Sequence, residues 1–358
     1  MLPVYYYKDL TPRVRVRKSN MMVKSDYTAL VRAENVQTIL RKLETTPYKP
    51  YAAQLLTEEF TPERVEDSLI RSYQVEVQFL LTQLTKRKAI DVFKGLNNSF
   101  EMEALSGIAK LILLNTAWES AAGTILPHGK LDLGTSKSLV EGKNLKRALQ
   151  MIKDESLVRE IEKILQEAED PTRQALDVEL AIKGFSAVDL WKKLKALEGA
   201  DVMALRLFGI WYDSLIMVSI LRMMKLGFKS SDMERSLPPV NFKVSRDDIK
   251  RAISAPSVKD AVKSFTSGYY VNVISPLLTA FEVSEDITLL EVAFKRFHAG
   301  ECQRVFSQIF NLGEGVAYTY LKWYEIRDLI AIIIGKHLGM HAEEIERHLI
   351  LHQPPHPI

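Results

Sequence analysis

The chain has 358 residues, of which 47% are hydrophobic and 26% charged, a balance typical of an ordinary globular protein and not of a disordered one. Its formal net charge of +3 is small for this length, which argues against nucleic acid as a dedicated ligand, because such proteins concentrate basic residues on one face. The single cysteine, Cys302, excludes an internal disulfide and fits a reducing compartment.

Residues 1–20 are expected to form an N-terminal arm. They lack the apolar run of a secretory signal. The basic side chains of Arg13, Arg15, Arg17 and Lys18 are expected either to be solvated or to contact anionic lipid heads or acidic loops of a neighbour. The alternating sequence RVRVR in this arm is the one stretch that departs from helical periodicity.

From residue 21 onward, apolar residues recur at helical spacing, which predicts an all-α protein. Thr61-Pro62 has the pattern of a helix start, with a capping residue before a proline. The segments 186–189 and 245–248 have the spacing of capping boxes. Gly313 and Gly315 are expected to break the chain before its last long helix.

Two loops divide the helical part of the chain. One is a glycine- and proline-rich stretch from Gly123 to Gly134, and the other is Pro238-Pro239. They predict three helical units over residues 21–130, 131–241 and 242–358. The tail HQPPHPI at the end of the third unit is expected to fray.

An aromatic residue followed by an acidic one recurs once in each unit. The pairs are Phe100-Glu101, Tyr212-Asp213 and Tyr324-Glu325, and successive acids are 112 positions apart. Such a constant period indicates internal repetition.

A second landmark keeps step with the first. Glu66, Asp177 and Glu291 each stand in a pattern of apolar, acid, two residues, apolar, and they precede the acids of the aromatic pairs by 35, 36 and 34 positions. Two units also begin alike, with LKRAL at 145–149 and IKRAI at 249–253. Three homologous units would bury a shared core, arranged either around a pseudo-threefold axis or in a line.

Two explanations remain open for the repeated acid. Each pair could open a helix, where an acid in the first turn favours the positive end of the helix dipole. Alternatively, a partly buried acid could tie neighbouring helices through a basic partner. The stretch from Tyr318 to Gly339 favours the second explanation if it forms one continuous helix with Glu325 inside it.

The sequence contains no site that points clearly to catalysis or to a cofactor. Phosphate-binding loops and the G-x-S-x-G elbow are absent from it. His337 and His341 are weak candidates for metal ligands because their i, i+4 spacing could place them on one helix face. Cys302 and His298 are expected to be structural. Residues 204–221 are expected to form a buried core helix and not a membrane span, because they carry charges.

The C-terminal motifs carry a resemblance to a known family. GVAY at 315–318, YEIRDL at 324–329 and GK at 335–336 resemble the C subunit of archaeal and bacterial A/V-type rotary ATPases, whose eukaryotic relative is the d subunit of the vacuolar proton pump. The helix at 27–43 followed by Thr-Pro-Tyr at 46–48 resembles the family's opening. The family often has Asn where this chain has Asp328.

The resemblance implies a funnel-like arrangement of three helical units around a pseudo-threefold axis. It implies a peripheral subunit without a transmembrane segment, on the cytoplasmic face of the membrane and without an active site or cofactor of its own. Its partners would be the shaft subunits D and F and the membrane proteolipid ring, and it would transmit torque for ion transport coupled to ATP synthesis or hydrolysis. A free-standing helical repeat scaffold and a helical metal-dependent enzyme are the competing hypotheses.

Overall fold

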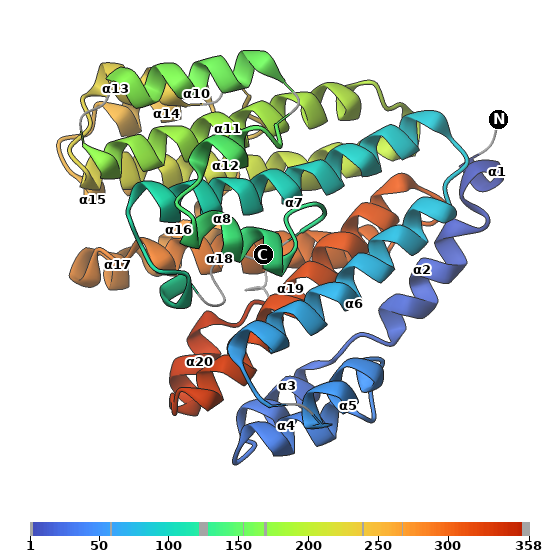
Figure 1. Cartoon of the computed structure of the whole chain (residues 1–358). Coiled ribbons are helices and arrows are strands. Elements are labelled where there is room, and N and C mark those ends of the chain that lie inside the picture. Colours follow the sequence, from blue (N-terminus) through green and yellow to red (C-terminus); the bar gives the residue numbers. More distant parts are fainter. Residues whose placement is uncertain are drawn as a thin grey trace.

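Helices form the fold throughout the part of the chain that the computed structural model describes, and no β-strand occurs there (Figure 1). The structure describes residues 3–57, 59–121, 128–152, 154–167, 170–237, 240–266 and 268–352. The prediction of an all-α protein is therefore confirmed. Of the predicted loops, Gly123 and Pro127, the Pro238-Pro239 pair and the tail after His352 lie outside the described residues.

A set of short helices followed by two long ones occurs three times along the described chain. Two helices precede these sets: α1 (Pro3–Tyr7) and α2 (Leu10–Ser19). The first set is α3 (Lys24–Val31), α4 (Val36–Leu43), α5 (Lys49–Thr57), α6 (Pro62–Thr82) and α7 (Arg87–Leu113), followed by η1 (Trp118–Ala121). The second is α8 (Leu133–Glu141), α9 (Leu145–Leu149), α10 (Glu155–Glu167), α11 (Pro171–Lys195), η2 (Gly199–Asp201) and α12 (Val202–Lys225), followed by α13 (Ser230–Ser236). The third is α14 (Arg246–Ile253), α15 (Val258–Ser264), α16 (Val271–Ile274), η3 (Ser275–Leu277), α17 (Leu278–Ser284), α18 (Ile287–Val305) and α19 (Leu312–His337), followed by α20 (Ala342–His348).

Two of the predicted helix starts are present. The Thr61 hydroxyl accepts a hydrogen bond from the Arg64 amide, and Pro62 opens α6. Ser245 and Asp248 form a capping box at the start of α14. Each cap satisfies amide groups that the first turn of a helix leaves without a partner.

The prediction that each aromatic–acid pair opens a helix is wrong. Glu101, Asp213 and Glu325 lie in the middle of α7, α12 and α19, well beyond the first turn. The helix dipole acts within the first and last turns. It therefore does not account for an acid at these positions.

The segment 186–189 does not start a helix either, because it lies inside α11. The Ser186 hydroxyl donates to the carbonyl of Lys183 at 3.1 Å, so it is satisfied within the helix. Asp170 is the real cap, and its carboxylate accepts the amides of Thr172 and Arg173.

Gly313 and Gly315 do not break the chain, because both lie in the first turn of α19. Gly315 permits a close approach between helices. A Cβ atom at this position would lie 2.8 Å from the ring of Phe93 on α7, which is closer than real Cβ contacts come. The sequence signal for flexibility is here a signal for packing.

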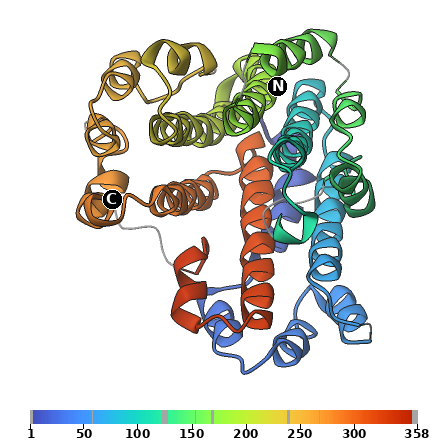
Figure 2. The same cartoon turned by 60° about the vertical axis from the view of Figure 1, so that its left-hand side comes forward.

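Helix α19 is the centre of the molecule. It packs against α2, α6, α12, α18 and α20, which belong to all three sets and to the N-terminal arm. Figure 2 shows α19 in red between the orange α18 on one side and the blue α6 on the other. Nearly every residue of α19 is buried, including its charged residues Glu314, Lys322, Glu325 and Asp328.

The apolar interior has two parts. The larger core surrounds α19 and extends from α2 to α20. A smaller one lies between α7 and α11 and is covered by α8, α9 and α10. The α7–α11 contact is the most extensive one between any two described helices.

The N-terminal arm contains helix α2, which docks on α19, so the arginines of the arm have partners within the chain. Arg15 binds the Glu314 carboxylate at 2.9 Å and donates to two carbonyls of the segment before α19. Arg17 binds Glu76 at 2.8 Å and stacks over the ring of Phe79. The alternating RVRVR sequence is therefore helical, and the expectation of a solvated arm is wrong.

Helix α12 is the one described helix that is long and apolar enough to cross a membrane by length and composition. Most of its apolar stretch, 72%, is buried inside the protein. The expectation of a core helix at this place is confirmed.

Candidate functional site

The repeated acid of the second set, Asp213, is completely buried and accepts four hydrogen bonds. Its carboxylate receives the amides of Phe242 (2.8 Å), Lys243 (2.6 Å) and Val244 (2.9 Å) and the hydroxyl of Tyr270 (2.8 Å). Burial raises the pKa of Asp213 although these hydrogen bonds oppose the rise. The carboxylate thus fixes the segment that leads into α14 against the middle of α12.

Glu325 on α19 does the same for the start of the first set. Its carboxylate, also completely buried, accepts the Met22 amide at 2.7 Å and the Tyr48 hydroxyl at 2.6 Å. Lys322, one turn earlier on α19, donates to it at 2.9 Å. The contact with Met22 joins residues that are 303 positions apart in sequence.

Among the described residues, Glu101 on α7 has the fewest partners of the three acids. It is half-buried and accepts the Lys130 amide at 2.9 Å, and no tyrosine hydroxyl within the described residues reaches it. The neighbouring Gly129 has a positive φ of 61°, and a Cβ atom there would lie 3.0 Å from the Glu101 carboxylate carbon. Glycine therefore allows this approach.

The three acids connect the sets in a cyclic order. Glu101 of the first set holds the segment before α8, Asp213 of the second holds the segment before α14, and Glu325 of the third holds the segment before α3. Their partners are mainly backbone amides and tyrosine hydroxyls. Within the described chain, only Glu325 has the basic partner that the tying hypothesis expected.

The second landmark does not share one environment. Glu66 is buried in α6. Asp177 accepts a hydrogen bond from the Ser236 hydroxyl at 2.9 Å, and burial raises its pKa. Glu291 on α18 forms an ion pair with Arg222 and faces a cavity.

That cavity has a volume of about 310 Å³ and lies between α7, α11, α12, α18 and α19. Its apolar wall includes Phe294, Trp211 and Trp323. Phe100, the aromatic residue of the first pair, also lines it and packs on Trp323 with ring centroids 4.9 Å apart. The cavity therefore takes residues from all three sets.

Basic residues exceed acidic ones in the cavity lining, five against three, which gives a formal charge of +2. The basic residues are Lys110, Lys183, Arg222, Lys295 and Arg327, and the acids are Glu103, Glu179 and Glu291. A largely apolar wall with a few converging charges is the usual character of a binding site.

Glu179 is the hub of the ion pairs in this lining. Its carboxylate lies 2.6 Å from the Lys183 ammonium, 3.6 Å from that of Lys110 and 3.7 Å from the Arg222 guanidinium. Burial opposes its ionisation, but these cations outweigh that effect and lower the pKa of Glu179 to about 2. Three of the five cavity cations thus share one carboxylate as their ion-pair partner.

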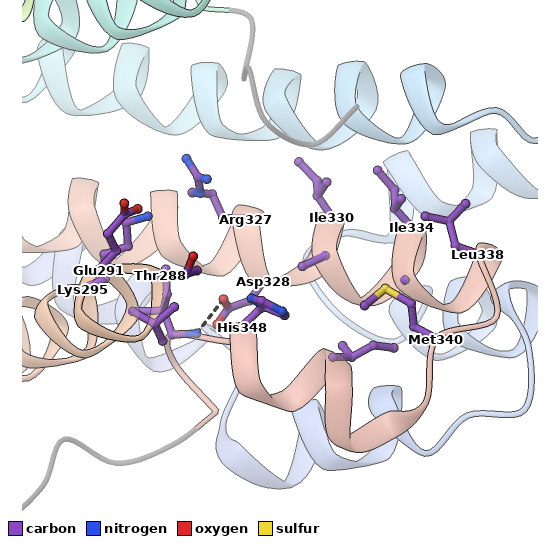
Figure 3. A pocket seen from close by; sticks show the side chains of 15 residues that line it. Thr288, Glu291, Lys295, Arg327, Asp328, Ile330, Ile334, Leu338, Met340 and His348 are labelled. Carbon is purple, nitrogen blue, oxygen red and sulfur yellow. Dashed lines mark hydrogen bonds between the residues drawn. The ribbon is translucent and has the colours of Figure 1, made fainter. Parts of the chain in front are cut away.

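A second cavity of about 380 Å³ adjoins the first between α18, α19 and α20, and the two share Glu291, Lys295 and Arg327 (Figure 3). On its floor Asp328 accepts the amides of Ile350 (2.8 Å) and Leu351 (2.7 Å). Burial raises the pKa of Asp328 to about 7. Asp328 thus holds the chain that follows α20 against α19.

The structure separates the two histidines suggested as metal ligands. His337 is the last residue of α19 and packs on the Phe60 ring, whereas His341 is the N-cap of α20. Gly339 between them has a positive φ of 75°, which ends the helix. Over the described residues, no group of three or more His, Cys, Asp or Glu side chains has the arrangement of a metal site.

Cys302 and His298 are both buried in α18. His298 Nε2 donates to the Leu207 carbonyl at 2.9 Å, which leaves Nδ1 to accept from the Tyr324 hydroxyl at 2.8 Å. Burial raises the pKa of the Cys302 thiol and lowers that of His298 to about 4. These are the properties of a neutral, structural pair and not of an activated nucleophile.

Sequence reasoning missed Asp201, which joins three distant parts of the chain. Its buried carboxylate accepts the Tyr7 hydroxyl (2.6 Å), the Lys86 ammonium (2.8 Å) and the Leu312 amide (3.0 Å). The positions 112 residues before and after it hold Ala89 and Gly313, so the repeat contained no signal for it.

Comparisons with known proteins agree with the resemblance carried by the sequence motifs. The model of the ATP synthase (C/AC39) subunit family matches residues 10–348. The C subunit of an A-type ATP synthase from Methanocaldococcus jannaschii is 21% identical over 349 residues, which cover 96% of this chain and 86% of the relative. Its counterpart from Desulfurococcus sp. is 22% identical over 337 residues, covering 93% and 88%. The resemblance to the C subunit of the A/V-type ATPases is thereby confirmed, and the chain belongs to the ATP synthase (C/AC39) subunit family.

Proposed function

We propose that this chain is the non-catalytic coupling subunit of the central rotor in an A/V-type ATPase. It links the central shaft to the membrane proteolipid ring and transmits torque between them during ion transport coupled to ATP synthesis or hydrolysis. The observation that carries this proposal is the match of residues 10–348 to the ATP synthase (C/AC39) subunit family. The buried Glu325 site, which joins the third helix set to the first, supports the closed arrangement that such a role requires.

The proposal includes three homologous units over residues 21–130, 131–241 and 242–358, with residues 1–20 as an arm. The cyclic order of the Glu101, Asp213 and Glu325 contacts supports a pseudo-threefold, funnel-like arrangement, because a linear stack would leave its last acid without a first unit to hold. The arm strengthens the same closure, since Arg15 on α2 binds Glu314 on α19.

A coupling subunit needs to resist deformation more than it needs to react. Close-packed interiors have low compressibility and transmit strain. Central helix α19 meets this requirement, because it is buried along most of its length between helices of the other two sets. Hydrogen bonds and ion pairs between segments that are far apart in sequence, such as those of Glu325, then transmit a force applied to one helix set to the other sets.

In this proposal the shaft is formed by subunits D and F and would bind at the cavity between α7, α11, α12, α18 and α19. The proteolipid ring would bind another face of the chain. The chain would sit peripherally on the cytoplasmic side of the membrane through the ring. Charges and aromatic rings from all three sets converge on the cavity, which supports its role as the place where a partner is gripped.

The proposal is tested by reconstitution with purified shaft subunits and detergent-solubilised proteolipid ring. A complex that contains shaft, chain and ring should elute together at low ionic strength, and omission of the chain should separate shaft from ring. If neither partner associates with the chain, the coupling role is rejected in favour of a free-standing helical scaffold. Zinc, nickel or cobalt bound in near-stoichiometric amount to the purified chain would instead favour the metal-dependent alternative.

A further inference from the structure

Two of the five cavity cations have no counterion within the described chain. Lys295 on α18 and Arg327 on α19 are both half-buried in the cavity wall, and neither makes a hydrogen bond or ion pair to a described residue. The other three cations bind Glu179, and Arg222 also binds Glu291. Lys295 and Arg327 therefore stand apart from the ion-paired part of the lining.

These two unpaired cations act on each other. Burial lowers the pKa of Lys295 to about 8, and the positive charge of Arg327 contributes to that shift. Glu291 and Glu103 oppose this shift, but neither forms an ion pair or hydrogen bond with Lys295 or Arg327, and Glu291 is bound by Arg222. Two like charges in a partly desolvated wall are unfavourable until an anion joins them.

We propose that Lys295 and Arg327 bind a carboxylate side chain from an acidic segment of a partner protein. The inference rests on the proposed function, in which that partner is the rotor shaft. Figure 3 shows Arg327 projecting from α19 on the side opposite Asp328 and His348, which leaves its guanidinium free of the C-terminal segment. A carboxylate placed between the two cations makes charge-assisted hydrogen bonds to both.

The rest of the lining favours a protein carboxylate over a phosphate or a nucleic acid. Three glutamates lie in the same wall, so a dianionic phosphate or an extended polyanion would meet repulsion that a single carboxylate largely avoids. The apolar groups beside the cations, including Phe294 and Trp323, suit the aliphatic stem of a glutamate and its apolar neighbours on a partner helix.

The first test measures how fast Lys295 reacts with an acylating reagent at pH 8, read by mass spectrometry of peptides. A pKa near 8 makes Lys295 nucleophilic at this pH, whereas ordinary lysines remain protonated. A short oligoglutamate peptide should slow the modification about fivefold or more, because ion pairing raises the pKa of the amine and covers it. Oligolysine and inorganic phosphate serve as controls and should leave the rate unchanged.

The second test uses the full chain and the purified shaft. The double variant Lys295→Gln, Arg327→Gln should raise the Kd for the shaft about tenfold or more, since hydrogen bonds to charged groups contribute strongly to recognition. The matched control, Lys94→Gln with Arg246→Gln, removes one lysine and one arginine that are exposed and do not line the cavity, and it should bind like the unaltered chain.

The outcomes separate this inference from the proposed function. Unchanged Lys295 reactivity with oligoglutamate, or equal protection by phosphate, overturns the carboxylate site. A shaft that binds the double variant as tightly as the unaltered chain also overturns it but leaves the coupling role intact. A shaft that does not bind the unaltered chain rejects the coupling role, while protection by oligoglutamate alone still supports the carboxylate site.

Discussion

Asp213 and Glu101 occupy the same place in two successive helix sets, yet they hold the chain in different ways. Asp213 is completely buried and accepts three amides and a tyrosine hydroxyl, whereas Glu101 is half-buried and accepts one amide from the described residues. The connection between the first and second sets, near Glu101, has a second source of stability. Helices α7 and α11 pack along much of their length over a separate apolar core. Equivalent connections between successive helix sets can therefore be stabilised either by a buried polar site or by apolar contact between helices.

The largest effect is expected from Asp213→Ala. The change leaves three buried amides and the Tyr270 hydroxyl without an acceptor, so the free energy of unfolding should fall by about 3–5 kcal/mol. Urea denaturation followed by circular dichroism measures the loss. A loss below about 1 kcal/mol would show that water replaces the carboxylate and that the site is not a structural joint.

Asp328 offers a related comparison, because it also holds backbone amides but titrates near neutrality. Burial raises its pKa from 3.8 to about 7, so between these pH values the folded chain keeps a proton that the unfolded chain has released. Stability should therefore fall as the pH rises through this window. Relative to Asp328→Asn, which does not titrate, the unaltered chain should lose about 2–3 kcal/mol of unfolding free energy between pH 5 and pH 8.

Denaturation of both proteins at several pH values measures this difference, and groups that titrate in both cancel. Parallel pH profiles would contradict the prediction.

Tyr270→Phe and Tyr48→Phe form a matched pair that removes only a hydroxyl from the sites of Asp213 and Glu325. Each should reduce the free energy of unfolding by about 1–2 kcal/mol, because each deletes a hydrogen bond to a buried carboxylate and retains the ring. If Tyr48→Phe were neutral while Tyr270→Phe was not, Lys322 would be sufficient to satisfy Glu325. Thermal unfolding of the two variants side by side gives the comparison.

The smallest effect is expected from Glu101→Ala. One amide at a half-buried site is easily hydrated, so the loss should be about 1 kcal/mol or less. Hydrogen exchange should nevertheless become faster at the Lys130 amide. A loss as large as that of Asp213→Ala would mean that the α7–α11 contact does not stabilise this joint independently.

The sequence predicted the helical fold, because apolar side chains recur at helical spacing. It also indicated the repeated acids, because their spacing along the chain is constant. It did not reveal what the acids bind. The partners of Glu101 and Asp213 include the amides of Lys130 and Lys243, and backbone donors leave no trace in residue type. Because these partners could not be seen in the sequence, an acid in the middle of a helix could not be distinguished from an acid that opens a helix.

The cavity could not be predicted from the sequence for a different reason. Lys183, Lys295 and Arg327 come from three helices, and only the packing of α11, α18 and α19 brings them together. Lys183 and Lys295 are 112 positions apart, as the repeated acids are, but Arg327 has Leu215 at the corresponding place in the second set, so the repeat does not predict the cluster. The ion pairs that Glu179 forms with Lys110 on α7 and Arg222 on α12 also depend on helix packing.

The Glu325 site has a consequence for the order of events during synthesis. Met22 and Tyr48 leave the ribosome early, but their acceptor is made 303 and 277 positions later. At roughly 5–20 residues per second, the start of the chain waits on the order of tens of seconds for its final partner. Helix α2 packs on α19, which is also synthesised late. Until then Leu10 and Val14, which are buried in the folded chain, are exposed and accessible to chaperones.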